Sequence, residues 1–287
     1  MAGSETAWRR FWNRGTWWKA LLLVVVYWGV YQLLGLGIST VFAGLIDHGD
    51  PLATPASIFF AIALPILVAG LLLVVLAWSL GWLRELFGPQ PIRGRGWMWI
   101  AVVLVLVPVV LRLIGTNWSA YSATRVLSVL FLGLCVGFAE ELLTRGFVVT
   151  ILRKGGYGER TVYLVSSLIF ALLHAGNAIT GQGILTVGVT VLYAFGFGAM
   201  MYLAMRLTGS LIWPILLHAA TDPTTILATG GIDSSNGDTA GAGGLISVAG
   251  IFLYLYLALA IVAIFLVKNR DRVFPRHDRD QGAYPAA

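Results

Sequence analysis

The feature that most constrains this chain is a series of apolar runs, most of them about 20 residues long, the length a helix needs to cross a bilayer. A single soluble core could not bury so many such runs. Charged residues make up only 11% of the chain, against about 25% in ordinary soluble domains. The sequence therefore predicts an all-α polytopic membrane bundle of about eight transmembrane helices. The predicted spans are residues 20–46, 57–80, 97–114, 126–152, 162–174, 184–205, 210–226 and 245–267.

The regions outside the spans indicate topology. Residues 1–19 form a basic segment with interleaved tryptophans, which is typical of the lipid headgroup region, and residues 268–287 form a polar tail. Residues 20–267 make up the transmembrane domain, with a Gly/Ser/Asp-rich loop at 230–244 that we expect to be mobile.

The distribution of basic residues along the spans predicts the orientation. When the spans are counted alternately, every Lys and Arg except Arg112, Arg125 and Arg145 falls on one side. By the positive-inside rule both termini are cytoplasmic, in an integral protein of the cell membrane. The basic residues lie at the ends of apolar runs rather than on one polar face, so the expected partner is the lipid bilayer and not nucleic acid.

Three charged residues lie inside the predicted span 126–152, namely Glu140, Glu141 and Arg145. An uncompensated carboxylate there costs about 2.5–3.5 kcal/mol, so each charge needs a partner or a purpose. Glu141 and Arg145 stand at i and i+4 and are expected to pair as a structural ion pair. Glu140 is rotated by about 100° from Glu141 and is left to face something else.

Two of the four histidines also fall inside predicted spans. His174 follows Phe170 by one helical turn, and His218 precedes Asp222 by one turn. Glu140, His174 and His218 lie 13, 14 and 12 residues from the nearest flanking arginine, which corresponds to a depth of about 18–21 Å. Three helices thus bring polar groups to one predicted level, where we expect them to share a water-accessible cavity.

Such a group supports the activation of water in more than one way. Glu140 can act as a general base with a histidine as its partner. Glu140, His174 and His218 are alternatively a ligand set for a divalent metal such as zinc, since two histidines and a glutamate form an accepted catalytic zinc site. His218 with Asp222 could instead donate hydrogen bonds to an oxyanion, and buried ionisable groups also serve as proton or ion relays.

The glycines of the span 184–205 have a different predicted role. Gly188, Gly196 and Gly198 are expected to allow close approach between helices rather than to bind phosphate.

The order of these motifs carries a resemblance to a known family. Glu140-Glu141-X-X-X-Arg145, Phe170-X-X-X-His174 and His218-X-X-X-Asp222 resemble the motifs of the CPBP intramembrane proteases. That family includes the CAAX prenyl endopeptidases and the bacterial abortive-infection or bacteriocin-immunity proteins. The stretch 208–215 is also typical of the family, and the resemblance covers about residues 127–223, within a protease-like core at 126–226.

The resemblance implies an intramembrane endopeptidase that hydrolyses peptide bonds of membrane-anchored, CAAX-type prenylated substrates. Glu140 would activate water with His174 as its partner, while His218 and Asp222 would polarise the scissile carbonyl or complete the water site. Many family members have Asn in place of Asp222. An ionised Asp cannot donate a hydrogen bond, so orienting His218 or binding a metal becomes a stronger role for it.

The remaining motif residues are assigned supporting roles. Glu141 and Arg145 would be structural, and Phe170 would shape the pocket. The alternative reading is a non-proteolytic membrane immunity or transport protein that uses the same buried polar cluster as a relay.

Overall fold

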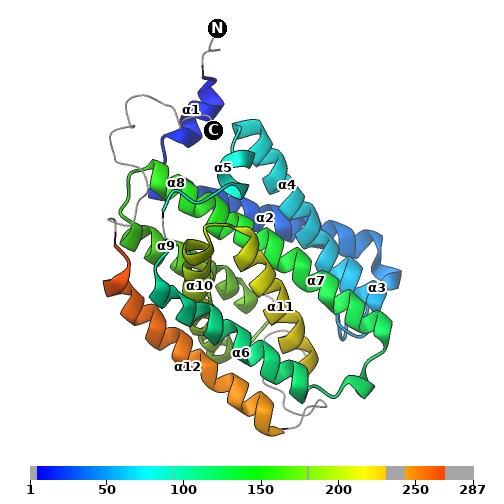
Figure 1. Cartoon of the computed structure of the whole chain (residues 1–287). Coiled ribbons are helices and arrows are strands. Elements are labelled where there is room, and N and C mark those ends of the chain that lie inside the picture. The colour runs from blue at the N-terminus through cyan, green and yellow to red at the C-terminus, as the bar shows by residue number, and fades with distance from the viewer. Residues whose placement is uncertain (1–4, 93, 180, 231–242, 269–287) are drawn as a thin grey trace.

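The computed structural model describes residues 5–92, 94–179, 181–230 and 243–268, and regular secondary structure in these residues is helical (Figure 1). Within these described ranges, seven helices are long and apolar enough to cross a membrane. The predicted class, an all-α polytopic membrane bundle, is confirmed. The predicted loop at 230–244 and the tail at 268–287 fall almost entirely outside the described residues.

The seven long helices match the predicted spans with shifts of a few residues. They are α2 (Trp17–Val41), the continuous α3 (Pro55–Ser57), η2 (Ile58–Ala63) and α4 (Leu64–Leu80), α6 (Trp99–Gly115), the continuous α7 (Ala123–Glu141), η5 (Leu142–Val148) and α8 (Val149–Lys154), α9 (Glu159–Leu173) with η6 (His174–Ala178), α10 (Ile184–Thr208) and α12 (Gly243–Leu266). Shorter helical elements are α1 (Ala7–Asn13), η1 (Ala43–Leu45), α5 (Leu83–Phe87), η3 (Gly96–Met98) and η4 (Trp118–Ala120).

The seventh predicted span, residues 210–226, corresponds to α11 (Ile212–Thr229), which is not among the seven helices that are long and apolar enough to cross a membrane. Its apolar sequence is diluted by His218, Asp222 and several threonines. It nevertheless reaches the end of the bundle where α7 begins, since the Tyr121 hydroxyl donates to the Leu227 carbonyl at 2.8 Å. The bundle thus contains α11 as an interior helix beside the seven apolar ones.

The described ends of the chain lie at the same end of the bundle. Gly15 packs against the backbone of Ile151 and Gly155, and the Tyr163 hydroxyl near the start of α9 donates to the Ala260 carbonyl of α12 at 2.7 Å. Figure 1 shows α1, α5 and α8 gathered at that end. The assignment of this end to the cytoplasm stays a prediction from the positive-inside rule.

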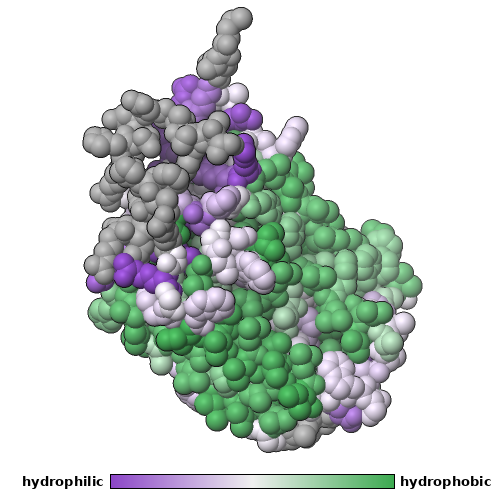
Figure 2. Space-filling view, in the orientation of Figure 1, coloured by the Kyte–Doolittle hydropathy of each residue, from purple (hydrophilic) through white to green (hydrophobic). Residues whose placement is uncertain are grey.

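The outer faces of the long helices carry the apolar side chains. Large hydrophobic residues are exposed along α2, α4, α6, α7 and α12. Figure 2 shows apolar residues over most of the visible flank and hydrophilic residues towards the α1 end. A surface of this kind suits lipid tails and supports an integral membrane protein.

Close contact between α7 and α11 forms the centre of the bundle. A Cβ on Gly133 would lie 2.3 Å from Cγ of Pro223, and one on Gly137 would lie 2.8 Å from the Ile215 carbonyl oxygen. Only glycine lets the two backbones approach this closely. Because Gly133, Gly137 and Glu141 are spaced at i, i+4 and i+8, Glu141 continues the face of α7 that meets α11.

The predicted role of the three α10 glycines is confirmed in part. A Cβ on Gly196 would lie 2.9 Å from Cβ of Tyr256, and one on Gly198 would lie 2.8 Å from Nη2 of Arg145. A Cβ on Gly188, however, would have no atom of another described helix within 4 Å, so the prediction of a close approach there is wrong.

Candidate active site

Glu140 and Glu141 occupy the last turn of α7, immediately before the π-helical turn η5. The wider π turn opens the i to i−4 hydrogen-bond pattern, and such turns often occur at functional sites. The Thr144 hydroxyl donates to the Glu140 carbonyl at 2.6 Å. A threonine one turn along thus satisfies the carbonyl of the residue that carries the free carboxylate.

Glu141 links two cationic groups with its two carboxylate oxygens. Its Oε2 lies 3.2 Å from Nε of Arg145, and its Oε1 lies 2.9 Å from Nδ1 of His218. The Glu141 side chain is completely buried. The expected ion pair with Arg145 is present, but sequence reasoning missed that Glu141 also anchors His218. The spacing of Gly137 and Glu141 on one helical face was the signal that could have revealed it.

Arg145 connects this pair to neighbouring helices. Its Nη2 donates to the Gly198 carbonyl at 2.6 Å, and its Nη1 donates to the Thr144 hydroxyl at 2.5 Å. The guanidinium lies 4.3 Å from the ring centre of Phe170. The arginine is therefore held by α10 and α9 in a fixed position, which is consistent with a structural role.

His218 lies on α11 among three carboxylates. Its Nε2 is 3.3 Å from Oδ2 of Asp222 and 4.0 Å from Oε2 of Glu140, while its Nδ1 faces Glu141. Carboxylates on both sides of the ring favour the doubly protonated imidazolium, in which both nitrogens donate. With His218 charged, the cluster holds three carboxylates against two cations, and Glu140 is the carboxylate left over.

His174 lies where α9 passes into η6. Its Nδ1 is 3.1 Å from the Phe170 carbonyl oxygen, which can only accept, so Nδ1 carries the proton. In the neutral ring Nε2 is then an acceptor. His174 interacts electrostatically with Glu140, and Phe170 packs against both histidines, with ring centres 5.2 Å from His174 and 5.7 Å from His218.

The cluster is closed on one side and open on the other. Glu141 and His218 have side chains that are 0% and 4% exposed, whereas Glu140 and Asp222 are 22% and 31% exposed. The Oε2 atom of Glu140 has no hydrogen-bond partner among the described residues. Glu140 is thus held beside a charged histidine with one carboxylate oxygen uncommitted, which is what a general base requires.

The predicted metal ligands do not converge as a metal site. No group of three or more His, Cys, Asp or Glu side chains in the described part of the chain is arranged to hold an ion. The 4.0 Å between Nε2 of His218 and Oε2 of Glu140 also exceeds the roughly 3.4 Å that two neighbouring ligands of tetrahedral zinc would span. We therefore derive no catalytic step through a metal.

The depth predicted for His218 from the twelve residues that separate it from Arg206 is wrong. Arg206, from which the twelve residues run, belongs to α10, and the chain reverses at Gly209 (φ 70°) before α11 begins. Glu140 and His218 nevertheless meet, because α7 and α11 cross at Gly133 and Gly137.

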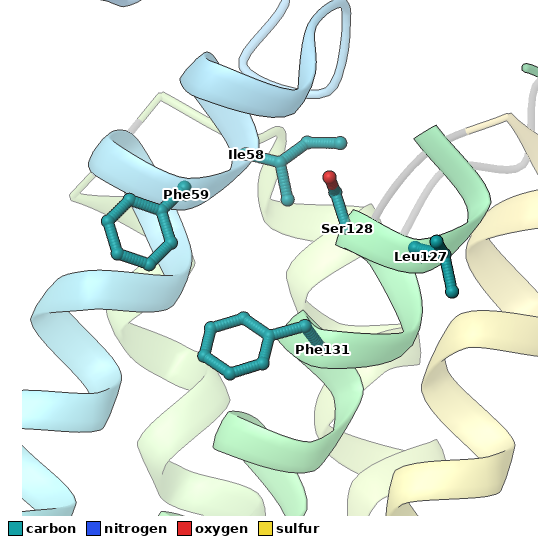
Figure 3. A pocket seen from close by; sticks show the side chains of 5 residues that line it. All are labelled: Ile58, Phe59, Leu127, Ser128 and Phe131. Atoms are coloured by element: carbon teal, nitrogen blue, oxygen red, sulfur yellow. The ribbon is translucent and has the colours of Figure 1, made fainter. Parts of the chain in front are cut away.

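A pocket lies elsewhere on α7 (Figure 3). It has a volume of about 340 Å³ and is lined by Ile58 and Phe59 of η2 and by Leu127, Ser128 and Phe131 of α7. Phe131 precedes Glu140 by about 13 Å of helical rise. The pocket is therefore an apolar hollow separate from the charged cluster.

A second buried ionic cluster surrounds Glu159 at the first turn of α9. Nε and Nη2 of Arg153 donate to its two oxygens, each at 3.0 Å, and the Tyr202 hydroxyl donates to Oε2 at 2.5 Å. Nη1 of Arg206 lies 3.4 Å from the same oxygen, and Arg206 is completely buried. Arg153 and Arg206, which the sequence places among the topology signals, thus share one carboxylate inside the protein.

Comparison with protein families places the cluster within a recognised domain. The family model of type II CAAX prenyl endopeptidase, Rce1-like, matches residues 122–224, a stretch that contains Glu140, His174, His218 and Asp222. The resemblance inferred from the motifs is confirmed. The match supports a CAAX-type intramembrane protease in general and implies a lipid bilayer and membrane-anchored substrates. No curated protein matches the chain.

Proposed function

We propose that the chain, whose residues 122–224 match the Rce1-like type II CAAX prenyl endopeptidases, hydrolyses peptide bonds of membrane-anchored, CAAX-type prenylated substrates by glutamate-activated water. The observation that carries the proposal is the position of Glu140. Its side chain is 22% exposed, its buried Oε2 atom has no hydrogen-bond partner among the described residues, and that oxygen lies 4.0 Å from Nε2 of His218. With the predicted orientation, the substrate is cleaved from the cytoplasmic side.

Glu140 acts as the general base. Its carboxylate takes a proton from a water molecule while the water oxygen forms a bond to the scissile carbonyl carbon, and the carbonyl π electrons move to the oxygen. When this oxyanion collapses, the C–N bond breaks and the leaving amine takes the proton from Glu140. Glu140 is thereby regenerated, and such proton transfer contributes about 10²–10⁴-fold to rate.

The histidines position the water and balance the charge. The acceptor Nε2 of neutral His174 receives the second hydrogen of the water and fixes its orientation. His218, held by Glu141 and Asp222, places a positive charge 4.0 Å from Glu140, which favours the ionised form of that carboxylate over the protonated form.

A cleavage assay on the full-length protein in detergent tests the proposal. Wild type should cleave a prenylated CAAX peptide, whereas Glu140→Ala and His174→Ala should lower kcat by about 10²–10⁴-fold. Glu85→Gln is a matched control. Glu85 forms an ion pair with Lys154 at 2.9 Å and takes no part in the cluster around Glu140. Cleavage by both variants at the wild-type rate would exclude the peptidase and favour the non-proteolytic immunity or transport alternative.

A chelator distinguishes the two mechanisms left open by the sequence. We propose the metal-free form, so EDTA should leave kcat unchanged and purified protein should contain less than one equivalent of zinc. Loss of activity in EDTA that zinc restores would instead assign Glu140, His174 and His218 as ligands.

A further inference from the structure

The face of α11 that carries His218 continues as a polar strip to the end of the helix. His218, Asp222, Thr225 and Thr229 stand at i, i+4, i+7 and i+11, so they share one face over about 16 Å of helical rise. The side chain of His218 is 4% exposed and that of Asp222 is 31% exposed, and both threonines are half-buried. The charged cluster therefore opens along α11 from His218 towards Thr229.

This partial exposure does not belong to the lipid-facing flank of α11. The large apolar side chains of Ile212, Trp213 and Leu216 are exposed and mark that flank. Because an α-helix turns by about 100° per residue, the strip that begins at His218 lies roughly opposite them. The surface that Asp222 exposes thus faces the interior of the bundle rather than the lipid tails.

The cluster is closed towards the end of the bundle that holds α8. Residues 141–149, which lead from α7 into α8, are all buried, and so are residues 196–206 of α10. The rings of Phe170 and Phe197 also pack edge-on against His218, with centres 5.7 and 5.0 Å from the imidazole. These contacts leave no exposed side chain between the cluster and α8 along the two described stretches.

The strip leads to the opposite end of the bundle. Helix α11 ends where α7 begins, since the Tyr121 hydroxyl donates to the Leu227 carbonyl at 2.8 Å. Helix α9 rises by about 22 Å from Glu159 to His174 and so brings His174 towards the same end. Both half-buried threonines of the strip therefore lie between the cluster and the end of the bundle that is far from α1, α5 and α8.

The strip presents hydrogen-bond acceptors. The Thr225 hydroxyl donates to the Thr221 carbonyl at 2.8 Å, and the Thr229 hydroxyl donates to the Thr225 carbonyl at 2.9 Å. Since these protons are used within the helix, the hydroxyl oxygens act towards a ligand as acceptors, as does an ionised Asp222. Such a strip suits a small neutral donor, above all water, and disfavours anions.

We infer that the hydrolytic water reaches Glu140 along the Asp222, Thr225 and Thr229 strip, from the end of the bundle opposite α1, α5 and α8. This inference rests on the proposed hydrolysis, which consumes one water molecule for each bond cleaved. A substrate anchored by a lipid chain approaches from the apolar flank and brings no water with it. Thr225 and Thr229 are positioning residues that guide water and do not touch the scissile bond.

Thiol labelling tests the direction of the route. Cys135 is the only cysteine, so Thr225→Cys and Thr229→Cys in a Cys135→Ala background each carry one thiol. In sealed vesicles, a membrane-impermeant methanethiosulfonate should modify both thiols from the side opposite the N-terminus, the side on which a protease cannot remove an N-terminal tag. Thr208→Cys is the matched control. Thr208 is a half-buried threonine that donates to the carbonyl one turn back, but it lies at the α8 end and should be modified from the N-terminal side.

The adduct should also stop the supply of water. Relative to the same variant before modification, kcat of Thr225→Cys should fall at least about tenfold while KM stays within about threefold, because water and not the peptide is excluded. A methyl adduct should lower kcat less than a bulky one, a dependence on size that a merely structural role would not produce. Modified Thr208→Cys should keep its kcat. The double variant Thr225→Val/Thr229→Val keeps the side-chain shapes but makes the strip apolar, so it should lower kcat without raising KM and serves if a thiol variant does not fold.

The outcomes separate this inference from the proposed function. Modification from the N-terminal side, modification from neither side, or full kcat after modification would overturn the route while cleavage that depends on Glu140 stands. A rise in KM at unchanged kcat would assign the strip to the peptide instead of water. If Glu140→Ala cleaves as fast as wild type, the hydrolysis and its water supply are both overturned.

Discussion

The cluster around Glu159 and the cluster around His218 both bury charge within the bundle, but they are completed differently. Both oxygens of Glu159 accept hydrogen bonds, from Arg153 and Tyr202, and Arg206 adds a second cation. The His218 cluster has an excess of carboxylate, and Oε2 of Glu140 has no hydrogen-bond partner among the described residues.

This difference separates structural burial of charge from functional burial. A buried ion whose hydrogen bonds are all made to its partners holds helices together and has no free atom for a reaction. An uncommitted carboxylate is costly in an apolar environment, and it persists where it serves binding or catalysis. We therefore assign Glu159 to joining α8, α9 and α10, and Glu140 to the reaction.

The largest combined effect on stability and activity is expected for Glu141, which is part of a buried ion pair and also holds His218. Glu141→Gln leaves Arg145 and His218 without their shared counter-charge, and breaking a buried pair costs about 3–5 kcal/mol. We expect the thermal midpoint to fall by roughly 10 °C and kcat to fall by about 100-fold.

The double variant Glu141→Gln/Arg145→Met sharpens this test. It should recover part of the thermal midpoint, because the unpaired guanidinium is gone, but no activity. Recovery of both would show that Glu141 has no role beyond neutralising Arg145.

Glu159→Gln should reproduce the loss of stability without the loss of chemistry. Arg153 and Arg206 would then face each other with no carboxylate between them, so the midpoint should again fall by roughly 10 °C. The kcat of the folded protein, measured at low temperature, should stay within about threefold of wild type. A loss of kcat that matches that of Glu141→Gln would abolish the distinction between the two clusters.

An intermediate effect is expected at the crossing of α7 and α11. In Gly137→Ala the added methyl group would meet the Ile215 carbonyl, which forces the helices apart at a cost of about 1–3 kcal/mol. Because His218 and Glu141 lie one turn further along, kcat should fall by at least tenfold. Gly188→Ala, in open space, is the control and should change neither quantity.

The smallest effect is expected for Asp222→Asn. The amide oxygen can still accept from Nε2 of His218, so kcat should change by less than about tenfold and the midpoint by less than about 2 °C. Cleavage and thermal unfolding are measured on the same preparation. A loss of activity as large as that of Glu140→Ala would require a proton-carrying or ligand role for the Asp222 carboxylate.

The sequence predicts the spans well, because each needs only a long apolar run. It also places Glu140, His218 and Asp222 in one cluster, since the motif spacing fixes which helix face each residue occupies. One predicted span, α11, is not apolar enough to count as a membrane-spanning helix by length and composition. Its apolar character is reduced by His218 and Asp222, the same residues that indicate a function.

Other features depend on contacts between distant segments and were beyond pattern reasoning. The bond from Glu141 to His218 requires the crossing set by Gly133 and Gly137. The burial of Arg206 could not be predicted, because an arginine at the end of an apolar helix is usually exposed.

The π turn at Leu142–Val148 holds one residue more than an α-helical turn would hold in the same space. Deleting one residue after Arg145 would therefore let the turn close into a regular α-helix and leave Glu140 and Glu141 facing nearly the same neighbours. The same deletion between Gly137 and Glu140, in the regular helix, would instead rotate both acids by about 100° relative to Gly133 and Gly137, which pack on α11. A single lost codon could therefore silence this protein at one position of α7 and be tolerated a few residues further on.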